Sequence, residues 1–298
     1  LKNDGAVLKV PSGMELAVTT DTLNAGTHFL PDETPANIAR KALRVNLSDL
    51  AAMGAQPYCY QLALALPEKP AAAWLAAFTG ALLEDQKTYG LFCSGGDTTT
   101  IIGPLTITIT AMGLVPEGKA LRRSGARAGD LIVLTGPVGL AGIGLKILKG
   151  QIQTAQSQPF LRAYQAPEPP VTLAEALRTH AHAAIDISDG LVADLAHICR
   201  ASGLSAAVDL QGVRMFEPAR ALLDAGQVSL QELLSSGDDY EIIAAVPPEN
   251  IESFRAQAAK AGRHLHVLGR FQAGAPHVEA IGPDGQTLVF SHSGWKHF

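Results

Sequence analysis

The sequence predicts a two-domain protein of the α/β (α+β) class, with a sheet-and-helix domain followed by an α/β domain. The chain has 298 residues, which is enough for two separate hydrophobic cores. Strand and helix patterns alternate in both halves of the chain. A connecting stretch at residues 116–122 separates the halves. We place the domains at residues 1–118 and 119–298.

Composition and charge exclude several classes of function. The formal net charge of −5 provides no basic surface for nucleic acid, and no apolar run is long enough to cross a membrane. The first ten residues, LKNDGAVLKV, lack the layout of a signal peptide. The three cysteines are far apart and fit neither a disulfide framework nor a zinc site. We therefore expect a cytoplasmic protein that binds neither nucleic acid nor membrane.

The elements of the first domain follow from periodicity. Apolar residues at helical spacing, with a proline suited to a first helical position, predict a helix at 35–52. Trp74, Phe78 and Leu82 at i, i+4 and i+8 predict a second helix at 70–89. Strands are expected at 15–20, 58–66, 91–94 and 105–114. The first of these is expected to end at Asp21, and the third to run into Gly95-Gly96-Asp97.

In the second domain, an apolar strand at 130–134 leads into the glycine-rich stretch TGPVGLAGIGL. Residues 151–170 are rich in Gln and Pro and are expected to form an irregular surface loop. Strand and helix patterns resume at Ala183 and continue to about residue 269. The first of them, AAIDISDGLVADL, predicts a strand, a polar turn and a helix.

Six aspartates indicate a metal site. Most stand where a strand stops or a helix closes, beside Gly, Ser or Thr: Asp4, Asp21, Asp49, Asp97, Asp186 and Asp189. Strand ends are where open sheets present functional groups. Oxygen ligands without a His or Cys cluster suit Mg²⁺ or Ca²⁺. Mg²⁺ keeps several waters and is shared with substrate phosphates, so scattered aspartates suit it better than one compact cage.

Structural roles explain most of these aspartates equally well when each is taken alone. An Asp beside Gly is typical of a turn, and Ser188 or Asp189 could cap the helix that follows. Asp49 differs, because it lies inside a predicted helix, where Asp is unfavourable. It therefore requires a partner, which could be a cap, an ion pair or a metal.

Other motifs are less specific. Arg122 and Arg123 suit phosphate contact, although paired arginines are more often a solvated surface. The glycines of TGPVGLAGIGL could let backbone amides approach an anion, or could serve tight packing. In SSGDDYEI, capping or solvation explains two of the charges. The histidines other than His28, His197 among them, show no metal-ligand spacing and are expected to have surface or packing roles.

The chain resembles the thiamine-monophosphate kinase family of the AIR synthetase-like (PurM-like) superfamily in seven stretches: NDGAVL, LAVTTDTLNAGTHFLP, KALRVNLSDLAAMGAQP, GGDTT, LRRSGARAGD, AIDISDGLVADLAHI and GDDYE. They run from residue 3 to about residue 241 and cover most of the chain. Within the superfamily, the combination of TTDTLNAGTHF with NLSDLAAMGA is specific to this family.

The resemblance implies a PurM-like fold in which the first domain forms a homodimer through its sheet. It implies transfer of the γ-phosphoryl group of ATP, the co-substrate, to the phosphate of thiamine monophosphate, with several Mg²⁺ ions. It also implies roles for particular residues. The Mg²⁺ ligands would be Asp4, Thr19, Thr20, Asp21, Asp49, Asp97, Asp186 and Asp189; Arg123 and Ser188 would contact ATP; His28, Asp238 and Trp295 would contact the thiamine substrate.

The chain departs from the family pattern at three places. Asn3 replaces a carboxylate, TTTIIGP follows Asp97 where the family has TTRG, and Asp238 replaces a glutamate. These departures bear on one metal position and on substrate affinity. Two alternatives stay open: another ATP-using enzyme of the superfamily, acting on a purine precursor or on selenide, and a non-catalytic nucleotide- or metal-binding protein.

Overall fold

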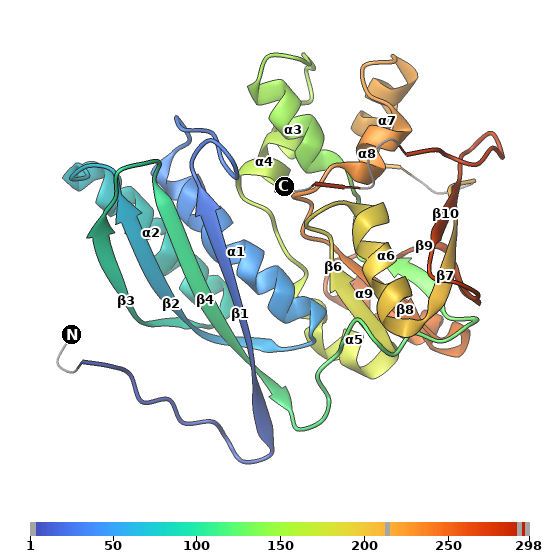
Figure 1. Ribbon diagram of the computed structural model, residues 1–298, viewed down its shortest axis with the longest axis horizontal. Helices are drawn as coiled ribbons and strands as arrows, with labels where there is room; N and C mark the ends of the chain where they lie inside the picture. The colour runs from blue at the N-terminus through green and yellow to red at the C-terminus, as the bar shows by residue number, and fades with distance from the viewer. Residues whose placement is uncertain (1–3, 212–214, 291–293, 296–298) are drawn as a thin grey trace.

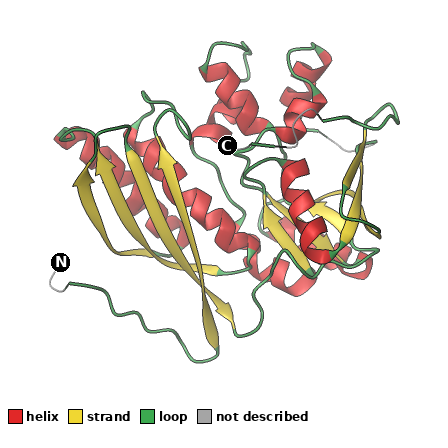
Figure 2. Ribbon diagram, viewed as in Figure 1, coloured by secondary structure: helices red, strands yellow, loops and turns green. Residues whose placement is uncertain are grey.

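The strands of the two halves form two separate sheets, which are joined through one central helix (Figure 1). The computed structural model describes residues 4–211, 215–290 and 294–295. Figure 2 shows the sheets as two groups of strands with helices packed around them. Among the described residues, no helix is both long and apolar enough to span a bilayer.

The first sheet has the strand order β1-β4-β2-β3, with β2 and β3 parallel and the other pairs antiparallel. Its strands are β1 (Met14–Asn24), β2 (Gln56–Leu66), β3 (Phe92–Thr100) and β4 (Thr106–Pro116). Helices α1 (Pro35–Ala52) and α2 (Ala72–Tyr89) lie behind this sheet in Figure 1, and the face toward the viewer carries no helix.

The second sheet has the order β10-β7-β9-β5-β8-β6. Its strands are β5 (Leu131–Leu134), β6 (Ala183–Asp186), β7 (Leu204–Asp209), β8 (Ile242–Val246), β9 (His266–Ala273) and β10 (Val278–Ile281). The helices of this domain are α3 (Leu140–Leu148), α4 (Gln158–Gln165), α5 (Ala174–His180), α6 (Leu191–Ser202), α7 (Glu217–Asp224), α8 (Leu230–Ser235) and α9 (Ile251–Lys260). Short 3₁₀ turns lie at Val171–Leu173 and Pro248–Asn250.

Helix α1 has the bounds that the sequence predicts, because its start is locally encoded. Thr34 caps it by accepting a hydrogen bond from the backbone of Asn37, and Pro35 fills the first helical position. Twelve of its residues are buried, polar ones included. The reason is that α1 packs on the first sheet on one side and against the second domain on the other, where Ala51 and Ala52 share a core with residues of that domain. Edge strands β1 and β6 flank it (Figure 1).

Strands β1 and β3 are longer than the sequence suggested. β1 continues past Asp21 to Asn24, because Thr20 and Thr22 pair with threonines of β4 through their hydroxyls. β3 continues through Gly95, Gly96 and Asp97 to Thr100 instead of ending before them. Asp21 and Asp97 therefore lie within strands rather than at strand ends.

The expected irregular loop at residues 151–170 is wrong in part, because it contains α4. Phe160 and Tyr164, one helical turn apart, are both buried in this helix. The Gln- and Pro-rich composition concealed this short amphipathic pattern.

Gly96 offers a test of the β2–β3 pairing. A Cβ at this position would overlap the carbonyl of Leu62 on β2, whereas a Cβ at the neighbouring Gly95 would meet nothing within 4 Å. We expect Gly96→Ala to lower the free energy of unfolding by about 2 kcal/mol, because the strands must separate to admit the methyl group. Gly95→Ala is the matched control, expected within about 0.5 kcal/mol of the original chain. Urea unfolding measures both, and equal losses would contradict the packing argument.

Candidate active site between the two domains

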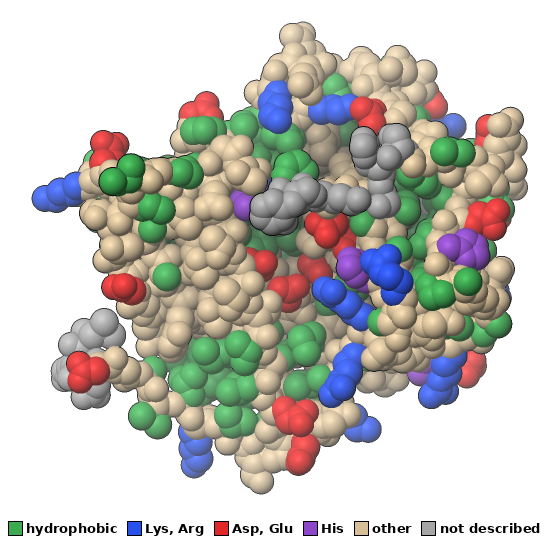
Figure 3. All heavy atoms as spheres, in the orientation of Figure 1, with side chains coloured by type: hydrophobic (Ala, Val, Ile, Leu, Met, Phe, Trp, Pro, Cys, Tyr) green, Lys and Arg blue, Asp and Glu red, His purple; other side chains and the backbone are tan. Residues whose placement is uncertain are grey.

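A cavity of about 890 Å³ lies where the two domains meet. The first domain contributes β1 and the turn that follows it, and the second contributes the turn after β6 and the loop after α8. Figure 3 shows acidic side chains gathered in the hollow between the halves, with basic side chains beside them on the second domain. Seven of the residues singled out by sequence line the cavity: Thr20, Asp21, His28, Ser188, Asp189, Asp238 and Trp295.

Asp21 of β1 lines the cavity, and Asp49 of α1 and Asp186 at the end of β6 lie close enough behind it for their charges to interact. The hydroxyl of Thr19 donates to Asp49 at 2.5 Å, and the hydroxyl of Ser48 donates to Asp186 at 3.0 Å. The partner that Asp49 requires inside its helix is therefore a threonine on the neighbouring strand. Three carboxylates from three elements converge on one acidic cluster.

Burial and mutual repulsion disfavour the charged forms of this cluster. Burial and the charge of Asp49 raise the pKa of Asp21 to about 7. Burial, then the charges of Asp49 and Asp194, raises the pKa of Asp186 well above its usual range. Burial also raises the pKa of Asp49, and the charge of Arg123 opposes that rise. Such a cluster has the electrostatics of a cation site and is unfavourable without a compensating positive charge.

The DISDG turn is held by a residue that the sequence analysis did not select. One carboxylate oxygen of Asp194 in α6 accepts hydrogen bonds from the backbone N–H groups of Ser188, Asp189 and Gly190 at 3.0–3.1 Å. The sequence offered Ser188 or Asp189 as the residue that caps α6, and neither does so. Gly190 occupies the N-cap position, and it has no side chain that could cap the helix. The side-chain cap therefore comes from inside the helix, one turn on.

His197 lies beside the carboxylates of Asp189 and Asp194, whereas the sequence predicted only a surface or packing role for it. Ligand atoms of Asp189, Asp194 and His197 lie within 4.8 Å of one another. Burial and the charges of Arg200 and Arg123 lower the pKa of His197, which favours the neutral imidazole that ligates metals. The i, i+3 spacing of Asp194 and His197 in α6 was the available sequence signal.

The loop 236–240 brings Asp238 to the cavity. Gly237 crosses the carbonyl of Ser188 so closely that a Cβ would overlap it. Asp238 takes a left-handed conformation (φ 68°), unusual for a residue with a side chain. Its carboxylate accepts from the ammonium of Lys41 at 2.9 Å and from the hydroxyl of Tyr240 at 2.9 Å. Neither Lys41 nor Tyr240 was selected from the sequence.

His28 and Trp295 border the same cavity from opposite domains. Nδ1 of His28 accepts from the backbone N–H of Asn24 at 3.0 Å, so the proton of the neutral ring lies on Nε2. Trp295 is 55% exposed, and its backbone N–H donates to the carbonyl of Asp189. Asn3 lies outside the described residues.

Asp4 and Asp97 do not join this cavity within one chain. They border a separate hollow on the open face of the first sheet. Asp97 is on β3 and Asp21 on β1, the two opposite edges, so three strand spacings of about 4.8 Å separate the strands that carry them. Thr20 points its hydroxyl at Thr110 on the open face, although its strand borders the cavity.

The glycine-rich stretch binds an internal carboxylate. The backbone N–H groups of Gly139 and Ala141 at the start of α3 donate to Asp239 at 2.7 and 3.4 Å. Glu241 is buried, accepts from Thr135 and pairs with Arg263 at 2.9 Å. Capping therefore explains Asp239, but Glu241 forms a buried ion pair instead of being solvated.

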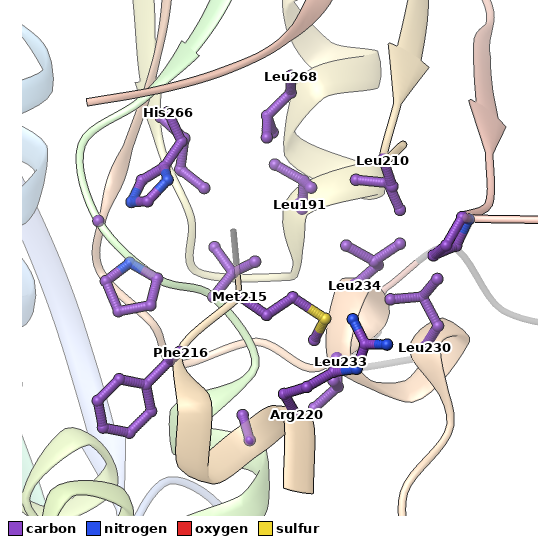
Figure 4. Close-up of a pocket in the computed structure, with 16 residues that line it drawn as sticks. Leu191, Leu210, Met215, Phe216, Arg220, Leu230, Leu233, Leu234, His266 and Leu268 are labelled. Carbon is purple, nitrogen blue, oxygen red and sulfur yellow. The ribbon is translucent and has the colours of Figure 1, made fainter. Parts of the chain in front are cut away.

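A second cavity, of about 220 Å³, lies between α7, α8 and β9 (Figure 4). Leucines such as Leu210, Leu234 and Leu268 point into it, with Arg220 and His266 at its sides. None of the described residues that line it carries a carboxylate. This mostly apolar cavity is therefore not the metal site that the aspartates indicate.

Comparison with known proteins identifies relatives along the whole chain. Residues 2–115 match the family model of the AIR synthase related protein, N-terminal domain, and residues 127–280 match that of the C-terminal domain. A thiamine-monophosphate kinase of Caulobacter vibrioides is 40% identical over 302 residues, covering 100% of this chain and 84% of the relative.

Two solved structures share the fold. The crystal structure of thiamine-monophosphate kinase from Stenotrophomonas maltophilia K279a aligns with a TM-score of 0.86 at 36% identity, covering 96% of this chain and 90% of that one. The structure of AaThiL complexed with AMPPCP and TMP aligns with a TM-score of 0.84 at 25% identity, covering 97% and 89%.

The acidic cluster predicts how pH affects stability in the metal-free protein. Because the pKa of Asp21 is about 7 in the folded chain and 3.8 ordinarily, the folded state binds the proton more tightly. Asp21 therefore costs stability increasingly as pH rises from 5 to 7.5. We expect the Asp21→Asn variant to have a higher free energy of unfolding than the original chain, and we expect this difference to grow over that pH range. Urea unfolding of both proteins in EDTA measures it.

Adding Mg²⁺ at pH 7.5 should make the original chain more stable to urea than Asp21→Asn. The reason is that a bound cation stabilises the folded original chain, whereas the variant lacks one of the carboxylates that bind it. Asp209→Asn, an exposed aspartate on β7, is the control and should change neither comparison. A pH-independent difference between Asp21→Asn and the original chain would contradict the electrostatic account.

Proposed function

The chain belongs to the AIR synthase-related family and, within it, to the thiamine-monophosphate kinases, and on that premise we propose how its own residues carry out the reaction. It is a two-domain kinase that uses ATP to phosphorylate thiamine monophosphate. The roles that we assign to residues rest on one observation. Asp21, Asp49 and Asp186 converge beside the cavity between the domains.

We propose that this cluster binds several Mg²⁺ ions. The donor set fits, because it consists of carboxylates and hydroxyls, which hard cations prefer, and because the repulsion among buried carboxylates favours a cation. The ligands would be Thr19, Asp21, Asp49, Asp186 and Asp189, together with Asp4, Thr20 and Asp97. When bound, Mg²⁺ would neutralise the charge of the phosphates that approach each other.

Direct transfer suits the residues of the cavity. The second pKa of a phosphate monoester is about 6, so the acceptor is largely a dianion at pH 7 and needs no general base. An acceptor phosphate oxygen forms a bond to the γ-phosphorus of ATP as the bond to the β–γ bridging oxygen breaks, which yields ADP and thiamine diphosphate. Alignment of the two phosphates and charge neutralisation are then the main requirements.

We assign the two substrates to neighbouring parts of the cavity beside the acidic cluster. Arg123, whose charge acts on Asp49, and Ser188 of the DISDG turn would contact ATP. His28, Asp238 and Trp295 would contact thiamine monophosphate. The Nε2–H of His28 is a suitable donor for a phosphate oxygen, and the ring of Trp295 is a suitable surface for stacking.

We further propose that two chains form a homodimer through the open face of the first sheet. This face carries no helix, and apolar side chains gather over part of it (Figure 3), with Val18 on β1 54% exposed and Phe92 at the start of β3 43% exposed. A second copy would cover this surface. It would also supply the residues missing from one chain's cavity, because Asp4 and Asp97 lie on the same face.

Two further assignments complete the proposal. The domain boundary lies between Gly118 and Lys119, in the turn after β4. The location is the cytoplasm, a proposal supported by three cysteines of which Cys59 and Cys199 are buried and free.

The assay that tests this function measures ADP release from Mg-ATP with thiamine monophosphate, thiamine or no acceptor. We expect release, with formation of thiamine diphosphate, only with the monophosphate. Asp186→Asn should reduce kcat by at least about 100-fold, because it removes a central carboxylate from the cluster. Asp224→Asn, at an exposed ion pair on α7, is the control. Equal release with thiamine and its monophosphate would contradict the assigned acceptor.

Mixed dimers test the partner's contribution. Asp49→Asn and Asp97→Asn chains should each be inactive alone. After unfolding and refolding together, half of the dimers are mixed, and each mixed dimer has one site with both native aspartates. We expect about a quarter of the original activity to return. If no activity returns although mixed dimers form, both aspartates belong to the site of a single chain.

A further inference from the structure

Lys41 is a buried cation that the roles assigned so far do not use. Its side chain is only 2% exposed, although lysine is rarely buried without a partner. Its Nζ lies 2.9 Å from Oδ2 of Asp238 and 3.9 Å from the centre of the Tyr164 ring. The ammonium group of Lys41 on α1 in the first domain therefore contacts two parts of the second domain, the loop that carries Asp238 and helix α4, which carries Tyr164.

The contact fixes a carboxylate that is already constrained. Asp238 has a left-handed backbone, its other oxygen accepts from Tyr240, and its N–H donates to the carbonyl of Ser188. Hydrogen bonds therefore restrain both of its carboxylate oxygens and its backbone. Strained conformations of this kind persist only where the surroundings determine them.

Lys41 lies behind the wall of the cavity. Asp238 and Tyr164 line the cavity, whereas Lys41 does not. On α1, Lys41, Val45 and Asp49 stand one turn apart along one face, and Val45 also lines the cavity. The same helix face therefore bears a carboxylate of the acidic cluster at one end and the cation that holds Asp238 at the other.

We propose that Lys41 is a positioning residue for the acceptor substrate: it holds the carboxylate of Asp238, and with it the loop 236–240, at a fixed distance from the acidic cluster. The inference rests on the proposed function, in which Asp238 contacts thiamine monophosphate. Lys41 acts through Asp238, so its loss should affect the acceptor and leave ATP binding largely unchanged.

Steady-state kinetics of Lys41→Met test this. Methionine keeps the unbranched shape and helix preference of the side chain and removes the charge. We expect KM for thiamine monophosphate to rise by about tenfold or more and KM for ATP to stay within about twofold. Arg40→Met is the matched control, because it removes the adjacent cation of α1, which pairs at 2.7 Å with the exposed Glu84, and it should change neither constant.

A double variant separates positioning from helix packing. In an Asp238→Asn background, Lys41→Met should change KM for thiamine monophosphate by less than about twofold, because the contact has already been weakened. A role in packing alone would give the same effect in both backgrounds. If Lys41→Met lacks the far-ultraviolet circular dichroism of the original chain, Lys41→Leu, which also removes the hydrogen-bond donor and favours a helix, takes its place in the same comparison.

The outcomes distinguish a failure of the proposed function from a failure of the role inferred for Lys41. An original chain that is inactive with thiamine monophosphate overturns the proposed function and this inference with it. An active original chain whose Lys41 variants leave KM for thiamine monophosphate unchanged, or raise both KM values equally, overturns only the inference. A selective, non-additive rise supports it.

Discussion

Burial of α1 between two sheets is the constraint on which the site depends. A helix covered on both sides buries many of its polar side chains, and three of them are satisfied by partners in other elements. Lys41 finds Asp238, Ser48 finds Asp186, and Asp49 finds Thr19. The partners come from both domains. The helix that forms the interface between the domains thereby also assembles the carboxylates of the cavity.

The acidic cluster makes this interface unfavourable on its own. Burying carboxylates against one another raises their pKa values, and a bound cation would relieve this cost. The glycine-rich turn of the second domain shows the opposite solution, because its amides are satisfied internally by Asp239. Backbone amides that could bind an anion are thus occupied by a carboxylate of the same chain. The carboxylates of the acidic cluster have no cationic partner within the cluster and would suit a bound cation.

The first sheet divides the aspartates selected from the sequence into two groups. Asp21 points toward the cavity from one edge strand, and Asp97 lies on the opposite edge, facing the open side. A site that uses both within one chain would have to span the sheet. The proposed pairing of two chains across the open face would remove that difficulty and would also cover the exposed apolar side chains there.

The sequence alone determined α1 with its bounds and the division of the chain into two halves, because caps and periodicity are local. Family resemblance contributed the set of site residues, which no spacing rule could have assembled. Tertiary structure alone decided the lengths of β1 and β3, because strand ends depend on what neighbouring strands offer. It also decided the contacts of Lys41, Asp194 and His197. Their partners are set by chain packing, and a buried charge is recognisable only once its surroundings exist.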